Sequence, residues 1–198
     1  MSVFDAARFV ASAHELHELL PDVGAEIAFA GRSNAGKSSA INALTQRKRL
    51  AFVSKTPGRT QTINFFDLGA NRRLVDLPGY GYAAAPQSER AHWGKLISAY
   101  LQGRHSLRGV VLISDARHPL TDLDRQLLAW HAPSGQPVLV LLTKADKLGR
   151  AQADGSLKAA VAALESAHAH ASAQLFSAVA GTGVRAAQRQ LAAWLAIP

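Results

Sequence analysis

The hydrophobic positions of this chain fall into short runs that alternate with longer stretches of helical periodicity. Apolar runs bounded by glycine, proline or polar residues are typical of strands buried in a sheet. These runs predict strands over 26–30, 63–68, 73–76, 110–114, 138–142 and 175–177, and an edge strand within 7–13. Apolar residues three and four apart predict helices ending near 45 and covering 88–102, 120–130, 156–171 and 183–195. Ser88 is expected to cap the second of these helices.

The alternation of strands and helices predicts a three-layer α/β fold around a mostly parallel sheet of six to seven strands. At 198 residues the chain is long enough for one full-sized domain and too short for two. No repeat or linker divides it. We therefore expect a single domain over 1–198, with residues 1–24 as a short N-terminal extension.

A glycine-rich motif lies between the first confident strand and the first helix. It consists of Gly31, Arg32, Ser33, Asn34, Ala35, Gly36, Lys37 and Ser38. Strand, glycine loop and helix is the context in which G-x-x-x-x-G-K-S forms a phosphate-binding P-loop. The backbone N–H groups of the loop and the positive end of the helix dipole bind the phosphates. Lys37 is expected to reach the β- and γ-phosphates, and the Ser38 hydroxyl to ligate Mg²⁺.

Three further motifs each follow a predicted strand. They are Asp76, Leu77, Pro78 and Gly79; Thr143, Lys144, Ala145 and Asp146; and Phe176, Ser177 and Ala178. The first would place a carboxylate beside the metal and a glycine N–H beside the γ-phosphate. In the second, Asp146 can accept two hydrogen bonds from the N1–H and 2-amino group of guanine. Adenine lacks this donor pair, and a buried site left unpaired rejects the wrong base. Lys144 would lie along the ring, and a backbone N–H after the last strand can reach guanine O6.

Composition and charge narrow the class of protein and of partner. The chain contains no cysteine, so disulfides, thiolate metal sites and cysteine nucleophiles are excluded. It has no membrane-length apolar run and no signal-peptide pattern, so we expect a cytoplasmic protein. The net charge is +8, and segment 45–75 carries seven basic residues and one acid. This basic segment, from Arg47 to Arg73, predicts either an RNA-binding surface or simply a solvated face.

The motifs in this order resemble those of translation-factor-class P-loop GTPases. The fuller strings 31–38, 56–62 (TPGRTQT), 76–83 (DLPGYGYA) and 143–146 resemble the EngB (YihA/YsxC) family of bacterial GTP-binding proteins, and the likeness covers nearly the whole chain. It implies a P-loop GTPase fold and binding of GTP and GDP with Mg²⁺. It also implies a role in assembling the large ribosomal subunit and a need for the protein in normal cell division and septation. The basic segment from Arg47 to Arg73 is then the predicted contact with the RNA of the large subunit or its precursor.

The resemblance also assigns a switch segment that physical reasoning alone does not resolve. The nucleotide-binding residues it implies there are Gly58, Arg59, Thr60, Gln61 and Thr62. Thr60 is the implied magnesium ligand, with Asp76 acting through a water molecule. Arginine stands at Arg59, where lysine is common in the family, and the charge is kept. The residues expected to take part in catalysis are therefore Lys37, Thr60 and Gly79.

Hydrolysis is expected to be slow. Many GTPases place a glutamine directly after D-x-x-G to orient the attacking water, and here that residue is Tyr80. A phenol has no amide to position water and cannot act as a base near neutral pH. Asn34 either holds a potassium ion against the phosphates, as in resembling GTPases, or hydrogen-bonds only its own loop. We expect a partner or an ion to complete catalysis.

Several residues keep two interpretations. Tyr80 and Tyr82 either pack beneath the switch, which we favour, or stack on a base. Asp115 ends a strand beside the site but matches no motif. The histidines show no metal-ligand spacing, and the three tryptophans are expected in the core.

Two other functions compete: a small-molecule P-loop kinase, which would have no use for the motif 143–146, and a GTP-dependent interaction protein at the division site without an RNA role. We expect a monomer.

Overall fold

The computed structural model describes residues 2–51, 62–81, 86–165 and 170–196. Its centre is a seven-stranded sheet in the order β1-β3-β4-β2-β5-β6-β7. The strands are β1 (Arg8–Ala13), β2 (Ala25–Gly31), β3 (Ile63–Gly69), β4 (Arg72–Asp76), β5 (Leu107–Asp115), β6 (Val138–Thr143) and β7 (Ala171–Leu175). The α-helices are α1 (Lys37–Leu44), α2 (Gln87–Gly103), α3 (Asp122–His131), α4 (Arg150–Glu165) and α5 (Val184–Trp194).

Five neighbouring strands of the sheet run parallel. β2 pairs in parallel with β4 and β5, β5 with β6, and β6 with β7, whereas β3 is antiparallel to both β4 and β1. Every residue of β6 is buried, as expected for a strand covered on both faces. The predicted mostly parallel sheet is confirmed. The predicted edge strand is also confirmed, since residues 8–13 of the N-terminal extension form β1 at one edge.

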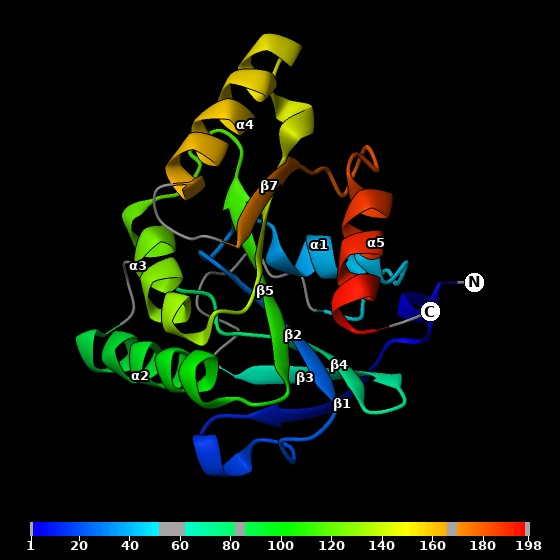
Figure 1. Ribbon diagram of the computed structural model, residues 1–198, viewed down its shortest axis with the longest axis vertical. Helices are drawn as coiled ribbons and strands as arrows, with labels where there is room; N and C mark the ends of the chain where they lie inside the picture. Colours follow the sequence, from blue (N-terminus) through cyan, green and yellow to red (C-terminus); the bar gives the residue numbers. More distant parts are fainter. Residues whose placement is uncertain (1, 52–61, 82–85, 166–169, 197–198) are drawn as a thin grey trace.

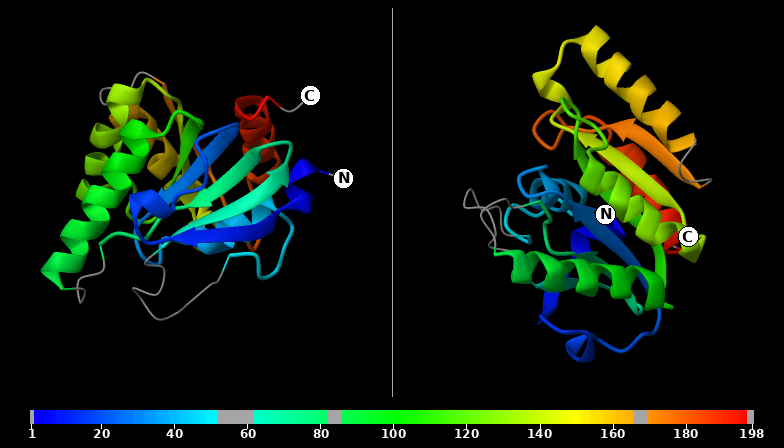
Figure 2. Two further views of the ribbon diagram at one scale, coloured as in Figure 1. Left: turned by 90° about the horizontal axis from the view of Figure 1, so that it is seen from below. Right: turned by 90° about the vertical axis from the view of Figure 1, so that its left-hand side faces the viewer.

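Helices cover both faces of the sheet and complete three layers (Figures 1 and 2). On one face, α2, α3 and α4 pack onto a core that includes Ala28, Ile97 and Leu127. On the other face, α1 and α5 pack onto a second core that includes Phe29 and Leu191. Consecutive residues of β2, Ala28 and Phe29, thus belong to different cores, as the pleat of a strand requires. The predicted three-layer fold is confirmed.

Several predicted boundaries are wrong. Helix α2 begins at Gln87 with Pro86 at its N-cap, so Ser88 lies inside the helix and does not cap it. Helix α4 begins at Arg150, six residues before the predicted start. The helix is predicted to extend to Ala171, but residues 166–169 lie outside the described residues and Ala171 is the first residue of β7. The pairing of Ala171–Leu175 with β6 outweighs the helix propensity of alanine there.

The aromatic side chains follow the prediction only in part. Trp93 is buried in α2, but Trp130 and Trp194 are only partly buried against the two cores. No helix in the described ranges is both long and apolar enough to cross a membrane.

The parallel strands bring the predicted motifs to one edge of the sheet. β2 ends at Gly31, β4 at Asp76, β5 at Asp115 and β6 at Thr143. The carboxyl ends of parallel strands lie at the same edge, which is where open α/β sheets bind ligands. The fold therefore gathers segments that are far apart in the sequence.

Candidate functional site

The P-loop has the backbone that its glycines predict. β2 leads into the loop, and Gly36 is the N-cap of α1 with a left-handed φ of 101°. Gly31 is needed for a different reason, since a Cβ atom there would lie 2.6 Å from the carbonyl oxygen of Ile113. Asn34 also has a positive φ of 64°, a conformation that asparagine tolerates better than most residues. The predicted order of strand, loop and helix is confirmed.

Lys37 and Asp76, from two separate motifs, form an ion pair within this site. The Lys37 ammonium donates a hydrogen bond to Asp76 Oδ1. Both residues are buried, because β4 lies beside β2 and its register places Asp76 opposite Phe29. Burial raises the pKa of Asp76, while the charge of Lys37 acts in the opposite direction. The lysine predicted to bind the phosphates and the carboxylate predicted to serve the metal are therefore adjacent.

The segment after Asp76 lies directly against the P-loop. The Ser33 N–H donates to the Tyr80 carbonyl over 2.8 Å. A Cβ atom on Gly79 would lie 3.5 Å from the Ser33 backbone, so the two segments of the backbone are in close contact. Gly79 is thus beside the loop that is predicted to hold the phosphates, as its expected role requires.

Tyr80 packs instead of pointing to the open site. Its ring lies partly buried against the core under α2 and α3, and its hydroxyl donates to Asp124 Oδ1 over 2.6 Å. Burial raises the pKa of Tyr80, and the neighbouring Asp124 carboxylate raises it further. Tyr80 therefore packs against the core, as favoured, whereas the switch residues 58–61 and Tyr82 lie outside the described residues.

Asp124 was not singled out in the sequence, yet it joins three elements. This buried carboxylate also accepts hydrogen bonds from the Ser114 hydroxyl and from the Thr121 backbone and hydroxyl. Thr121 and Asp124 form the capping box of α3. The T-x-x-D spacing signals that cap in the sequence, but nothing in it signals the contact with Tyr80.

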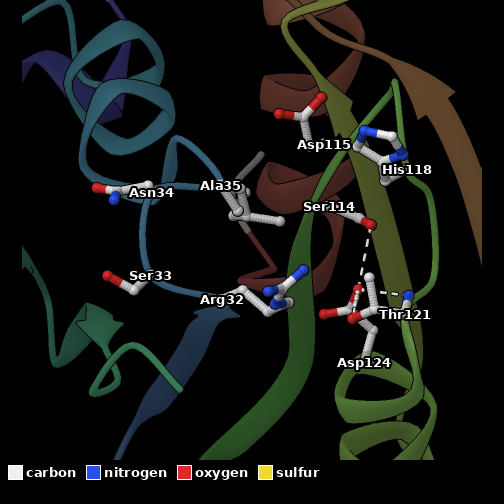
Figure 3. Close-up of a pocket in the computed structure, with 10 residues that line it drawn as sticks. Arg32, Ser33, Asn34, Ala35, Ser114, Asp115, His118, Thr121 and Asp124 are labelled. Atoms are coloured by element: carbon white, nitrogen blue, oxygen red, sulfur yellow. Dashed lines mark hydrogen bonds between the residues drawn. The ribbon is translucent and has the colours of Figure 1, made fainter. Parts of the chain in front are cut away.

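A hollow of about 120 Å³ separates the P-loop from α3 (Figure 3). It is lined by Arg32, Ser33, Asn34, Ala35, Ile113, Ser114, Asp115, His118, Thr121 and Asp124. Figure 3 shows the Asp124 carboxylate directed toward Ser114 and Thr121. The hollow therefore lies along the side of the P-loop that faces α3.

The motif 143–146 is tied to the P-loop by side chains. The Thr143 hydroxyl donates to the Ala35 carbonyl, and the Lys144 ammonium donates to the Asn34 carbonyl over 2.8 Å. Lys144 itself adopts a left-handed φ of 58°. The predicted base-binding residues are therefore held against the predicted phosphate-binding residues.

The motif 176–178 completes the same site. The Ser177 hydroxyl donates to Asp146 Oδ1 over 2.6 Å, and the Ala145 N–H donates to the Phe176 carbonyl over 3.2 Å. The hydrogen bond from Ser177 holds the pKa of Asp146 below its usual value. Phe176 and Ser177 follow β7 and do not form its end as predicted, because β7 stops at Leu175. Asp146 is thus kept as a carboxylate, the form that accepts hydrogen bonds from guanine.

Asp115 is the second acidic residue that sequence motifs did not assign. It lies 2.9 Å from the Lys144 ammonium and accepts hydrogen bonds from the Arg117 guanidinium. Burial alone would raise the pKa of Asp115, but the hydrogen bonds from Arg117 and Lys144 hold it well below its ordinary value. Its position at the end of β5 was the one signal available.

The described part of the predicted metal site fits Mg²⁺ in chemistry. The Ser38 hydroxyl stands in the first turn of α1, next to Lys37, and Asp76 supplies a buried carboxylate. Hydroxyl and carboxylate oxygens are the ligands that Mg²⁺ prefers. The predicted ligand Thr60 and its neighbours Gly58, Arg59 and Gln61 lie outside the described residues, whereas Thr62 donates to Asn64 beside β3. Among the described residues, no group of three histidine, aspartate or glutamate side chains is arranged to hold a metal.

Among the described basic residues of the segment from Arg47 to Arg73, some are engaged inside the protein; Lys55 and Arg59 lie outside the described residues. Arg73 pairs with buried Glu26, and Arg72 donates to the Ala196 carbonyl. Arg47 donates to the Asp5 carbonyl but remains exposed, as do Lys48 and Arg49.

Helix α5 adds basic side chains on the side of α1. Arg185 and Arg189 are exposed one turn apart, and Gln188 between them donates to the Leu44 carbonyl at the end of α1. Figure 1 shows α1 and α5 side by side. The exposed basic residues 47–49 are therefore joined by two arginines from the far end of the sequence.

The chain is similar in sequence to proteins of one family. A family model described as "50S ribosome-binding GTPase" matches residues 26–144. The "Probable GTP-binding protein EngB" of Methylobacillus flagellatus is 52% identical over 198 residues, covering 100% of this chain and 96% of that protein. The protein of the same name from Azoarcus sp. (strain BH72) is 56% identical over 196 residues, covering 98% and 94%.

Solved structures share the fold at lower sequence identity. A crystal structure of "a probable GTP-binding protein engB" matches with a TM-score of 0.65 and 20% identity, over 88% of this chain and 100% of that chain. Era in complex with MgGDPNP and nucleotides 1506–1542 of 16S ribosomal RNA matches with a TM-score of 0.65 and 18% identity, over 86% and 56%.

Proposed function

Because this chain belongs to the EngB family of GTP-binding proteins, we propose that it is a GTPase that acts as a nucleotide-dependent switch in large ribosomal subunit assembly. The observation that carries the proposal is the meeting of four motifs at one edge of the sheet. Lys37 contacts Asp76, Lys144 contacts the Asn34 carbonyl, and Ser177 contacts Asp146. Phosphate-binding and guanine-binding groups are thus held in one site.

Each group in the site has a distinct task in binding GTP. The P-loop N–H groups and the N-terminus of α1 bind the phosphates, and the buried Lys37 supplies a positive charge that phosphates can draw from Asp76. Asp146, held as a carboxylate by Ser177, accepts the two guanine donors. The N–H of Gly79, which lies next to Ser33, would bind the γ-phosphate.

Ser38, Asp76 through water, and Thr60 would hold Mg²⁺. When bound, this ion neutralises charge on the β- and γ-phosphates. The same residues that pair in the structure, Lys37 and Asp76, would then serve different partners: Lys37 the phosphates and Asp76 the hydrated metal.

Slow intrinsic hydrolysis is part of the proposal. The residue after D-x-x-G is Tyr80, whose hydroxyl is already donated to Asp124 and whose raised pKa rules it out as a base near neutral pH. A partner or a potassium ion would have to complete catalysis. Asn34 is the proposed potassium ligand, since its side chain is exposed at the P-loop while its carbonyl is occupied by Lys144.

The proposed partner is the large ribosomal subunit or its precursor. Exposed basic residues at 47–49 and at Arg185 and Arg189 can contact RNA phosphates, whereas Arg73 is engaged inside the protein. A role in cell division and septation could follow from this switch, or from a separate GTP-dependent interaction at the division site without RNA. Co-sedimentation with large ribosomal subunits distinguishes these two functions.

The decisive experiment is co-sedimentation with purified large ribosomal subunits across a salt series. We expect binding with a non-hydrolysable GTP analogue, weaker binding with GDP, and a loss of binding as salt rises. Replacing Arg185 and Arg189 by glutamine should weaken binding, whereas Arg8→Gln serves as control because Arg8 is exposed on β1 and pairs with Asp67. No binding in either nucleotide state would refute the ribosomal role and favour the division site.

A second experiment tests guanine recognition independently of the ribosome. Asp146→Asn removes the acceptor for the guanine 2-amino group and introduces an amide that can donate to the 2-oxygen of xanthine. We expect the variant to lose affinity for GDP and gain affinity for XDP. Unchanged preference for GDP would contradict the proposed base site.

A further inference from the structure

Three segments that are distant in the sequence meet behind Lys144. They are the P-loop at 34–35, the end of β5 at 114–115 and the motif residues 143–144. The Thr143 hydroxyl donates to the carbonyls of Ala35 and Ser114. The Lys144 ammonium, one residue further on, donates to the Asn34 carbonyl and lies 2.9 Å from the Asp115 carboxylate. Successive residues of the motif, Thr143 and Lys144, thus contact successive residues of both other segments.

The sheet itself places Asp115 in this junction. β5 and β6 pair in parallel, and their register sets Asp115 opposite Thr143, the residue before Lys144. The carboxylate therefore lies within reach of the lysine without any loop rearrangement. This placement therefore follows from strand pairing alone.

A second basic residue fixes the orientation of the Asp115 carboxylate. Arg117 donates to Oδ1 from its Nε over 2.9 Å and to Oδ2 from its Nη2 over 2.7 Å. Its backbone N–H also donates to Oδ1, over 3.0 Å. Paired hydrogen bonds between guanidinium and carboxylate constrain both direction and distance. The Lys144 ammonium therefore meets an acceptor whose position is set independently of the lysine.

Lys144 needs a fixed, charged acceptor if its side chain is to lie along the guanine ring, as the proposed function requires. Its side chain is about one-third exposed, and a long flexible side chain loses rotamer entropy when it must lie along a base. The Asn34 carbonyl is a neutral acceptor, and Asp115 is the charged one. Fixing the ammonium at the junction leaves the aliphatic stem to cover the purine ring.

We propose that Asp115 is a positioning residue for guanine nucleotide binding, which holds Lys144 in place and thereby slows nucleotide dissociation. The inference rests on the nucleotide binding proposed above and adds a residue that no motif assigns. Asp115 acts through Lys144 and not through the γ-phosphate or the guanine edge. Its loss should therefore affect GDP and GTP equally and leave the base preference, which belongs to Asp146, unchanged.

A double-mutant cycle tests whether Asp115 acts through Lys144. Dissociation rates of a fluorescent GDP and a fluorescent non-hydrolysable GTP analogue are measured by stopped flow for the wild type, Asp115→Ala, Lys144→Met and the double variant. We expect Asp115→Ala to raise both rates about tenfold, the loss of one charge-assisted hydrogen bond. In the Lys144→Met background the same change should alter the rates by less than about twofold. The inference would be overturned if the fold-increases of the two single variants multiplied in the double variant. It would also be overturned if Asp115→Ala had the wild-type dissociation rate.

Two controls separate positioning from general stability. Asp67 also pairs with an arginine, over 3.1 Å, and its side chain is 20% exposed against 17% for Asp115, but it lies in β3. Asp67→Ala should leave nucleotide dissociation within about twofold of wild type. Asp115→Asn keeps an acceptor but loses the charge, so its rate should fall between the wild type and Asp115→Ala. If Asp67→Ala speeds dissociation as much as Asp115→Ala, the effect is one of stability and the inference fails.

Nucleotide binding by the wild type tests the proposed function, and the effect of Asp115→Ala tests the role of Asp115. A wild-type protein that binds no guanine nucleotide would refute the proposed function itself. A wild-type protein that binds tightly, with Asp115→Ala unchanged, would refute only the role of Asp115.

Discussion

Replacing Tyr80 by phenylalanine removes a single hydroxyl and leaves the packed ring in place. That hydroxyl donates to Asp124, a buried carboxylate that retains the Ser114 hydroxyl and both Thr121 donors. A hydrogen bond to a charged group contributes about 1.5–3 kcal/mol net, and we expect the lower value of about 1.5 kcal/mol because the remaining donors still satisfy Asp124. For a chain of this size, that loss corresponds to a fall of about 3–6 °C in the melting temperature.

The chain offers a matched control at the opposite end of the sheet. Tyr100 donates its hydroxyl to buried Glu26 over 2.8 Å, and Glu26 keeps its bonds from Arg104 and Arg73. Tyr100→Phe should therefore destabilise the protein by a similar amount without touching the candidate site. Urea and thermal unfolding of both variants measure the two losses.

GTP turnover shows whether the Tyr80 hydroxyl only anchors its segment or also takes part in GTP hydrolysis. If the Tyr80 hydroxyl only anchors the segment after Asp76 to α3, turnover per folded molecule should stay within about twofold of wild type for both variants. The reasoning would be refuted if Tyr80→Phe kept full stability but lost turnover several-fold, because the hydroxyl would then serve the nucleotide and not Asp124.

Three further predictions concern the candidate site. Tyr80→Gln removes the bond to Asp124 and supplies an amide; if that amide turns to the phosphates and orients water, the hydrolysis rate should rise several-fold, and an unchanged rate in a turnover assay would remove support for that argument. If Asn34 ligates potassium, turnover should be faster in potassium than in sodium and the difference should vanish in Asn34→Ala, whereas equal wild-type rates would exclude the idea. Because Ser177 lowers the pKa of Asp146, the ionised form persists below the ordinary carboxyl pKa of about 4. GDP affinity measured by fluorescence titration should therefore stay constant from about pH 8 to 5, and a fall between about pH 7 and 6 would contradict this; Ser177→Ala should shift the loss of affinity to higher pH.

The sequence predicted the elements whose signals are local. The G-x-x-x-x-G-K-S string needs glycine where the backbone turns or passes close to β5, so Gly31 and Gly36 marked the loop without any tertiary information. Continuous apolar runs marked β5 and β6, because strands covered on both faces carry few polar residues. The order of the motifs then indicated where a nucleotide would lie.

Boundaries between helix and strand were less predictable where alanine dominates. The alanine-rich pattern predicts helix as far as Ala171 and strand only from Leu175, yet Ala171–Leu175 pairs with β6 and forms β7. Only the open edge of β6 decides between the two states, and that edge is created by a strand more than thirty residues away in the chain. A local propensity cannot record it.

Contacts between side chains from different elements were decided by the tertiary structure alone. The Asp115 carboxylate reaches Lys144 through the register of β5 and β6, and Tyr80 reaches Asp124 because α3 packs beside the segment after β4. Arg73 belongs to the basic segment in the sequence, but in the fold it forms an ion pair with buried Glu26, because a buried carboxylate requires a charged partner. Sequence by itself determined which chemical groups the site contains, because motifs are local. The fold decided how these groups are held and which charges remain free, because both depend on residues that meet only when the sheet has formed.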